Sequence, residues 1–412
     1  MYINNQHFPP FRIIARFYIS SYPWSPLIGS PAYLCITMAD TLLKTDSPRI
    51  SILDILRGFA LYGIILAHAA SIYLLELQSE GKKIGNETDL LIKSFLSFFV
   101  ERKFYLIFSF LFGLSFYIQF RNAKRKGQPF TIKFIWRLFV LFIIGLLHNQ
   151  FYAFDILHIY AIIGLLLIPV RHLNQRYLLF IIAILVVAAC LSSEFGHHIK
   201  SSSSMSLIAN LGFSQRIIHQ LSSGHFLMIL SLFYLGYWAG TVDLFNAKGF
   251  RTELLKKSLL LWSLALGVFL IIGSTLYYTA TLSALKSLWL SFCYIGGICL
   301  LYWYRKKWRL FWSALENLGR MGLTNYVLQT FFFFLLFEFG YKQVKNGELL
   351  SIIILANLFY FAQIIFSIYW FKKFSFGPLE WIWRNTTNLY KNQPLQKKKL
   401  HSMVEQDAPL SQ

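Results

Sequence analysis

Long apolar segments alternate with short polar or basic segments between residues 50 and 371. A transmembrane helix needs about 20 predominantly apolar residues. The sequence therefore predicts an all-α fold, a polytopic transmembrane helical bundle of about ten spans. The predicted spans are residues 52–76, 103–120, 134–150, 154–170, 177–192, 225–243, 258–279, 283–303, 321–338 and 350–371.

Three regions of different composition divide the chain. In residues 1–48, Pro and Ser interrupt every apolar run, so we expect an N-terminal extension that is interfacial or disordered. An alternative is that the native protein starts at Met38 and lacks residues 1–37. Residues 49–385 form the predicted transmembrane domain, and residues 386–412 form a polar, basic tail.

The charge distribution changes how the high net charge is interpreted. Hydrophobic residues make up 56% of the chain and charged residues only 14%, with a net charge of +21. With alternating spans, 28 of the 39 Lys and Arg residues lie on the side of the N-terminus and 10 on the other side. This asymmetry follows the positive-inside rule and predicts that both termini are cytoplasmic. We therefore expect membrane lipid as a partner and no nucleic acid.

The first predicted span carries three polar side chains, Asp54, Arg57 and His68. Arg57 and His68 are eleven positions apart, which corresponds to three helical turns plus about 20° and about 16 Å along the axis. They therefore share one face. One interpretation makes His68 a general acid or base and Arg57 an anion-binding group. The alternative is that Arg57 pairs with Asp54 and that His68 bonds to a neighbouring helix.

A second candidate site is the segment between residues 148 and 158, which joins two predicted spans. His148 ends one helix, Asp155 begins the next, and His158 follows one turn later. An Asp that orients a His raises the basicity of the imidazole. The alternative is that Asp155 only caps its own helix. That alternative does not explain a His at each end of the connection.

Two further groups have both a structural and a functional interpretation. Asn325 and Gln329 share one face of the ninth span, where amides either join helices or orient a substrate hydroxyl. The basic residues Arg121, Lys124 and Arg125 follow the second span. They satisfy the positive-inside rule and would equally suit the phosphates of coenzyme A or anionic lipid. The four Cys residues form no CxxC pair, so nothing supports a zinc site. We expect no metal or haem; a haem-binding electron carrier with His68, His148 and His158 as ligands is a third, less favoured hypothesis.

Several motifs resemble a known family in the same order along the chain. They are RISILDILRGFALYGIILAH, FYLIFSFLFGLSFYIQF, WRLFVLFIIGLLHNQFYAFDILHIYAIIGLL, GRMGLTNYVLQ and FGPLEWIWR. They resemble the YeiB-type bacterial membrane family, defined by domain of unknown function 418. The first motif is also similar, more distantly, to membrane acyltransferases that acetylate sugars, including the lysosomal heparan-glucosaminide acetyltransferase.

The resemblance implies particular roles and a location. In the sugar O-acyltransferases, an Arg and a His at this spacing are thought essential, which implicates Arg57 and His68. The GLLH…D segment belongs to the YeiB-type pattern, which also favours His148 and Asp155. The implied location is the bacterial inner membrane.

Two hypotheses from different classes follow. In the first, the chain is an acyltransferase that moves an acyl group from cytoplasmic acyl-CoA to a hydroxyl or amine of an envelope glycan, a lipid or a small molecule. His68, or His148 oriented by Asp155, would remove the proton of the acceptor. In the second, the chain is a transporter or flippase that uses the same polar face. We expect His68 and His148 to face one cavity, with Arg57 below them; a homo-oligomer is an open alternative to a monomer.

Overall fold

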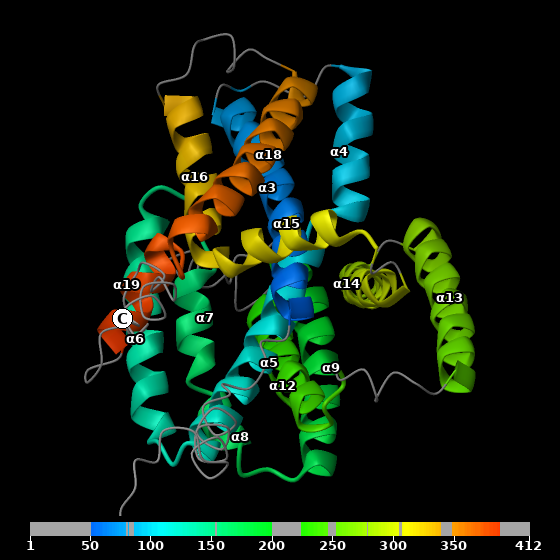
Figure 1. Cartoon of the computed structure of the whole chain (residues 1–412). Helices are drawn as coiled ribbons and strands as arrows, with labels where there is room; N and C mark the ends of the chain where they lie inside the picture. Colours follow the sequence, from blue (N-terminus) through cyan, green and yellow to red (C-terminus); the bar gives the residue numbers. More distant parts are fainter. Residues whose placement is uncertain are drawn as a thin grey trace, which may run out of the picture. The chain divides into compact units, whose positions relative to one another are not determined.

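A computed structural model describes residues 51–79, 81, 86–152, 155–199, 224–245, 253–277, 279–304, 307–338 and 348–387. The predicted N-terminal extension lies outside these residues, as does the predicted tail apart from residues 386 and 387. All regular elements of the described part are α-helices, which confirms the all-α prediction (Figure 1).

The helices follow one another with short connections wherever the chain is described. In order they are α3 (Ser51–Ser79), α4 (Glu87–Phe99), α5 (Lys103–Arg125), α6 (Phe130–Asn149), α7 (Leu157–Gly164), α8 (Leu167–Val170), α9 (Gln175–Ile199), α12 (His225–Thr241), α13 (Glu253–Leu276), α14 (Ala280–Tyr304), α15 (Arg309–Arg320), α16 (Gly322–Glu338), α18 (Leu349–Lys373) and α19 (Pro378–Thr387).

Six segments of the described residues are long and apolar enough to cross a membrane. They are Ser51–Leu75, Glu87–Arg125, Phe130–Asn149, Gln175–Glu194, Ala280–Tyr304 and Leu349–Lys373. The other four predicted spans also contain helices, but shorter ones. Helices α12 and α16 have 17 residues each, and the shorter apolar helices are Ser263–Leu276 within α13 and Gly322–Phe337 within α16. The predicted span 154–170 is divided between α7 and α8. Pro169 contributes to this division, because it lacks an N–H group and its ring crowds the carbonyl one turn earlier.

The second span begins earlier than its apolar pattern predicts, because α4 precedes α5 with a break at residues 100–102. Side chains satisfy carbonyl groups that the break releases from helical bonding. The Nζ atom of Lys103 donates to the carbonyl of Ser97 at 2.7 Å, and the Tyr294 hydroxyl donates to the carbonyl of Phe99 at 2.8 Å. Irregular backbone is tolerated within a membrane only where such partners are available.

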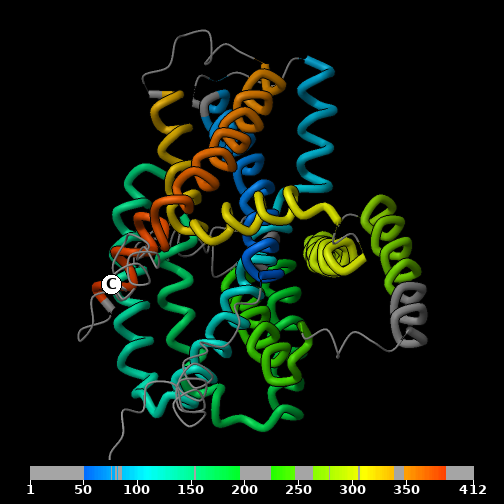
Figure 2. The backbone as a smooth tube through the Cα atoms, viewed as in Figure 1, coloured from blue at the N-terminus to red at the C-terminus, as the bar shows by residue number. Residues whose placement is uncertain are grey.

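Helix α3 packs against α5, α15, α16 and α18 and so lies among elements from both ends of the chain (Figure 2). Its contact with α15 depends on two glycines. A Cβ atom added to Gly58 would lie 2.2 Å from the carbonyl oxygen of Leu315, and one added to Gly319 would lie 1.8 Å from that of Asp54. Small residues allow this close approach. The predicted spans end at residue 303 and resume at residue 321, so α15 was not predicted.

Helix α19 joins α16 to α6. The Glu380 carboxylate accepts the N–H groups of Leu323 at 2.7 Å and Thr324 at 3.0 Å, and the Thr324 hydroxyl at 2.6 Å. It therefore caps the N-terminus of α16. On α6, the Trp383 indole donates to the carbonyl of Arg137 at 2.9 Å. The first turn of α16 is thus held from outside its own helix.

Candidate functional site

The connection between α6 and α7 brings two histidines and an aspartate together. Close packing of the two helices makes this possible: a Cβ atom added to Gly145 would lie 2.4 Å from the main-chain nitrogen of His158. Asp155 precedes α7, and His148 lies in the last turn of α6. The candidate residues of this segment therefore meet as the sequence analysis expected.

His148 and Asp155 form a buried pair. The Nδ1 atom of His148 lies 2.8 Å from Oδ1 of Asp155, and the two residues are 4% and 0% exposed. The other carboxylate oxygen accepts the N–H of Leu157 at 3.0 Å and lies 3.2 Å from Nδ1 of His158. Asp155 thus accepts the first N–H of α7 and also contacts both histidines.

The protonation of this pair follows from its contacts. The Asp155 carboxylate is buried, but its contacts with His148, His158 and the Leu157 N–H favour its charged form. An anionic carboxylate accepts the Nδ1–H of His148 and leaves the lone pair on Nε2. Within the described part of the chain, the Nε2 atom of His148 is buried and has no hydrogen-bond partner. This nitrogen is therefore available to accept a proton.

Tyr326 of α16 completes the contacts of the carboxylate. Its hydroxyl donates to Oδ1 of Asp155 at 3.1 Å. Its ring centroid lies 5.2 Å from that of His148 and 5.6 Å from that of His68. The two histidines therefore border the same buried tyrosine ring.

His68 is buried inside the bundle and does not face outward. Its ring lies 4.5 Å from that of Tyr152, and its Nδ1 atom lies 3.5 Å from the Thr330 hydroxyl, at the outer limit of a hydrogen bond. Unlike His148, it forms no hydrogen bond with a carboxylate of the described residues. His68 and His148 thus contact the same tyrosine, but only His148 is hydrogen-bonded to a carboxylate.

Arg57 makes contacts of its own near the start of α3. Its guanidinium bonds to Asp54 at 2.6 Å and donates to the Ser115 hydroxyl of α5, while the side chain keeps 28% exposure. The distance along the helix from Arg57 to His68 is about 16 Å. The pairing of Arg57 with Asp54, one of the two interpretations of this motif, is confirmed.

Asn325 and Gln329 connect α16 with its neighbours. The Asn325 amide donates to the Leu318 carbonyl at 3.0 Å, and the Gln329 amide donates to the Gln363 carbonyl oxygen at 3.0 Å and to the Leu61 carbonyl at 3.3 Å. Both residues therefore join helices. Their side-chain oxygens, however, are buried without a hydrogen-bond partner among the described residues. Each amide thus retains an acceptor.

The predicted basic group lies at the C-terminal end of α5. Lys124 and Arg125 are exposed in its last turn. Arg121 is 3.5 Å from Asp243 and lies over the Tyr117 ring. These basic residues belong to a different helix from His148.

In the described part of the chain, no group of His, Cys, Asp and Glu residues is arranged to hold a metal ion.

Tyr326 and Tyr152 were not among the residues predicted from the sequence. Tyr326 stands next to Asn325 in the motif GRMGLTNYVLQ, which is the one signal that could have identified it. The chain contains 23 Tyr and 41 Phe residues, so an aromatic residue inside an apolar run indicates nothing specific.

Comparisons with known proteins assign the chain to a family. It is 33% identical over 350 residues to the protein described as "Uncharacterized 39.9 kDa protein in amylase 3'region" from Bacillus acidopullulyticus, covering 82% of this chain and 94% of the relative. YxaH of Bacillus subtilis is 28% identical over 400 residues, covering 85% and 96%. YeiB of Escherichia coli is 42% identical over 76 residues, covering 18% and 19%. The chain belongs to the YeiB-like family.

Two family descriptions match this YeiB-like chain. "Heparan-alpha-glucosaminide N-acetyltransferase, catalytic" matches residues 49–268, and "Protein of unknown function (DUF418)" matches residues 239–390. No solved structure matches the chain. The first matched segment contains His68, His148 and Asp155, whereas Tyr326 lies in the second. The apolar helices and these relatives identify a membrane protein with an acetyltransferase-like segment.

Proposed function

We propose that this YeiB-like protein is an integral-membrane acyltransferase. It would move an acyl group from acyl-CoA to a hydroxyl or amine of an envelope glycan, a lipid or a small molecule. The observation that carries the proposal is the state of His148: its Nδ1 atom is held by Asp155, and its Nε2 atom is buried without a partner among the described residues.

The proposed reaction needs one base that later acts as an acid. Nε2 of His148 accepts the proton of the acceptor, whose oxygen or nitrogen attacks the thioester carbonyl. The carbon–sulfur bond then breaks, and the imidazolium returns the proton to the coenzyme A thiolate. Between these two proton transfers, the Asp155 carboxylate stabilises the imidazolium of His148. General acid–base catalysis of this kind contributes about 10²- to 10⁴-fold to a rate.

Different residues would bind the two substrates. The exposed Lys124 and Arg125 suit the phosphates of acyl-CoA better than Arg57, whose guanidinium is engaged by Asp54 and Ser115.

For the substrate that receives the acyl group, the side-chain oxygens of Asn325 and Gln329 would accept hydrogen bonds from its hydroxyl or amine. His158 would add a further contact from beside the Asp155 carboxylate. The proposed location is the bacterial inner membrane, with both termini in the cytoplasm.

A transfer assay with a matched pair of variants tests the proposal. The full-length protein in nanodiscs is incubated with radiolabelled acetyl-CoA, or with longer acyl-CoAs, and a bacterial envelope extract. We expect transfer of label, at least about a hundredfold slower in Asp155→Asn.

Asp89→Asn is the control, because Asp89 is also buried and accepts a tyrosine hydroxyl, that of Tyr73 at 3.0 Å. Equal loss in both variants, or no turnover of any acyl-CoA by folded protein, would contradict the proposal.

A further inference from the structure

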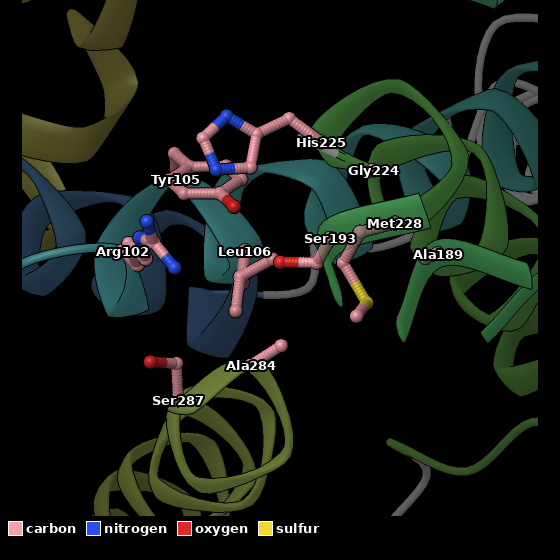
Figure 3. A pocket seen from close by; sticks show the side chains of 10 residues that line it. All are labelled: Arg102, Tyr105, Leu106, Ala189, Ser193, Gly224, His225, Met228, Ala284 and Ser287. Carbon is pink, nitrogen blue, oxygen red and sulfur yellow. The ribbon is translucent and has the colours of Figure 1, made fainter. Parts of the chain in front are cut away.

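A pocket separate from the His148 pair lies beside the break between α4 and α5 (Figure 3). Helices α5, α9, α12 and α14 surround it. Its polar lining consists of Arg102, Tyr105, Ser193, His225 and Ser287. Figure 3 shows the Arg102 guanidinium beside the Tyr105 ring, with the Ser193 hydroxyl reaching the pocket from another helix. None of its lining residues is an Asp or Glu.

Three of these side chains present hydrogen-bond donors that the described residues leave unused. Neither the Arg102 guanidinium nor the hydroxyls of Tyr105 and Ser193 bond to another described residue. A guanidinium offers only donors, and each hydroxyl offers one more. Such a set of donors complements an oxyanion.

The backbone at Arg102 is held in an unusual conformation. Arg102 has φ of 66°, in the left-handed region that favours glycine, and it shares this property with Asp243 alone among the described non-glycine residues. Bulky residues in this region cost energy and occur where the surrounding structure imposes them. At Arg102, the break between α4 and α5 imposes the left-handed conformation.

Two further cations, Lys103 and Lys286, are sequence neighbours of the lining residues Arg102 and Ser287. Lys103 is 2% exposed, and Lys286 and Arg102 lie close enough to repel its ammonium group. Glu101 is the acidic residue that interacts with this ammonium. The local charge is therefore positive even though Lys103 itself is bonded to the Ser97 carbonyl.

We propose that this pocket binds a phosphate group. Arg102 would contribute a bidentate, charge-assisted contact, and the hydroxyls of Tyr105 and Ser193 would bond to the remaining oxygens. Two sources share this chemistry, the head group of an anionic phospholipid and soluble phosphate. The site does not depend on the acyl-transfer proposal, since it uses none of the same side chains.

Substitution of Arg102 can separate binding from folding. Arg102→Gly removes the guanidinium and also relieves the left-handed backbone, so the unliganded variant should melt no lower than the parent. Arg102→Gln removes the charge and keeps a side chain. Lys93→Gln is the control, because it removes an exposed cation on α4 outside the pocket.

The measurement is the affinity of full-length protein in neutral detergent for two ligands, phosphatidylglycerol and inorganic phosphate, with phosphatidylcholine as the neutral lipid. We expect at least one anionic ligand to bind the parent and Lys93→Gln equally, and both Arg102 variants at least about tenfold more weakly. Binding of phosphatidylglycerol alone would assign the site to a lipid, and binding of both would assign it to the phosphate itself. Unchanged affinity in the Arg102 variants, or no binding of either anion to the parent, would overturn the proposal.

Discussion

The Nδ1 atom of His148 lies 2.8 Å from Oδ1 of Asp155, within a connection where helix α6 ends and α7 begins. This contact distinguishes two histidines that are otherwise alike, since both are buried and both border the ring of Tyr326. The imidazole of His148 has a carboxylate partner, whereas that of His68 has a long contact of 3.5 Å with the Thr330 hydroxyl.

The first prediction compares these histidines. His148→Ala should reduce the acyl-transfer rate constant by about 10²- to 10⁴-fold, because it removes the proposed base. His68→Ala should reduce this rate constant less, because the His68 ring has no carboxylate partner that would stabilise an imidazolium. Single-turnover kinetics with labelled acetyl-CoA measure both, and a larger loss for His68→Ala would assign the base to His68 instead.

The hydroxyl of Tyr326 provides the second prediction. Tyr326→Phe keeps the ring between the histidines and removes one hydrogen bond to an anionic carboxylate, an interaction of about 1.5–3 kcal/mol. We expect kcat to fall by about tenfold with the KM for acetyl-CoA unchanged.

The matched control is Tyr73→Phe, which removes a 3.0 Å hydrogen bond to Asp89 away from the site. If both substitutions lower kcat equally, Tyr326 acts through general stability and not through Asp155.

The third prediction concerns the close approach of α6 and α7. Gly145→Ala would place a Cβ atom 2.4 Å from the main-chain nitrogen of His158, so the two helices must separate. We expect a loss of about 1–3 kcal/mol in the free energy of unfolding together with a loss of transfer activity.

Gly297→Ala is the control, because a Cβ atom there meets nothing within 4 Å. Thermal melting and the transfer assay measure the two effects. An active Gly145→Ala protein would show that the spacing of the helices does not position the His148 pair.

The fourth prediction uses the pH dependence of stability. Burial raises the pKa of the Glu380 carboxyl above 4.5, despite the hydrogen bonds from Thr324 and Leu323. The folded protein therefore keeps this proton to higher pH than the unfolded chain does. Its contribution to stability is complete below the unfolded pKa and is lost as the pH rises through the folded pKa.

Melting temperatures measured between about pH 4.5 and pH 7 should consequently fall more steeply for the parent than for Glu380→Gln, which stays neutral throughout. Glu87→Gln, in the exposed first turn of α4, serves as the control. Parallel curves for the parent and Glu380→Gln would contradict the prediction.

The sequence predicted what depends on local pattern. The apolar runs gave the all-α class, and the short spacing between His148 and Asp155 allowed one connection to bring them together. Tyr326 was missed because its contact with Asp155 joins residues 171 positions apart, which only the packing of α16 decides.

The same reason applies to α15. The division of the span at residues 154–170 is different, because Pro169 contributes to it locally and the apolar pattern alone does not show it. The helix α15 has a strongly one-sided apolar face, but its short length and basic start resemble a cytoplasmic connection. Its place against α3 depends on two glycines far apart in the chain, Gly58 and Gly319, which no periodicity reveals.

The position of Tyr326 has a consequence for dissecting the protein. A fragment ending at residue 268 would contain the whole acetyltransferase-like segment, with His68, His148 and Asp155, but not Tyr326, whose ring contacts both imidazoles. Each half of the gene would thus encode an incomplete site. Co-expression of two separate pieces, divided in the segment before α13, becomes a complementation experiment in which activity returns only when the halves associate.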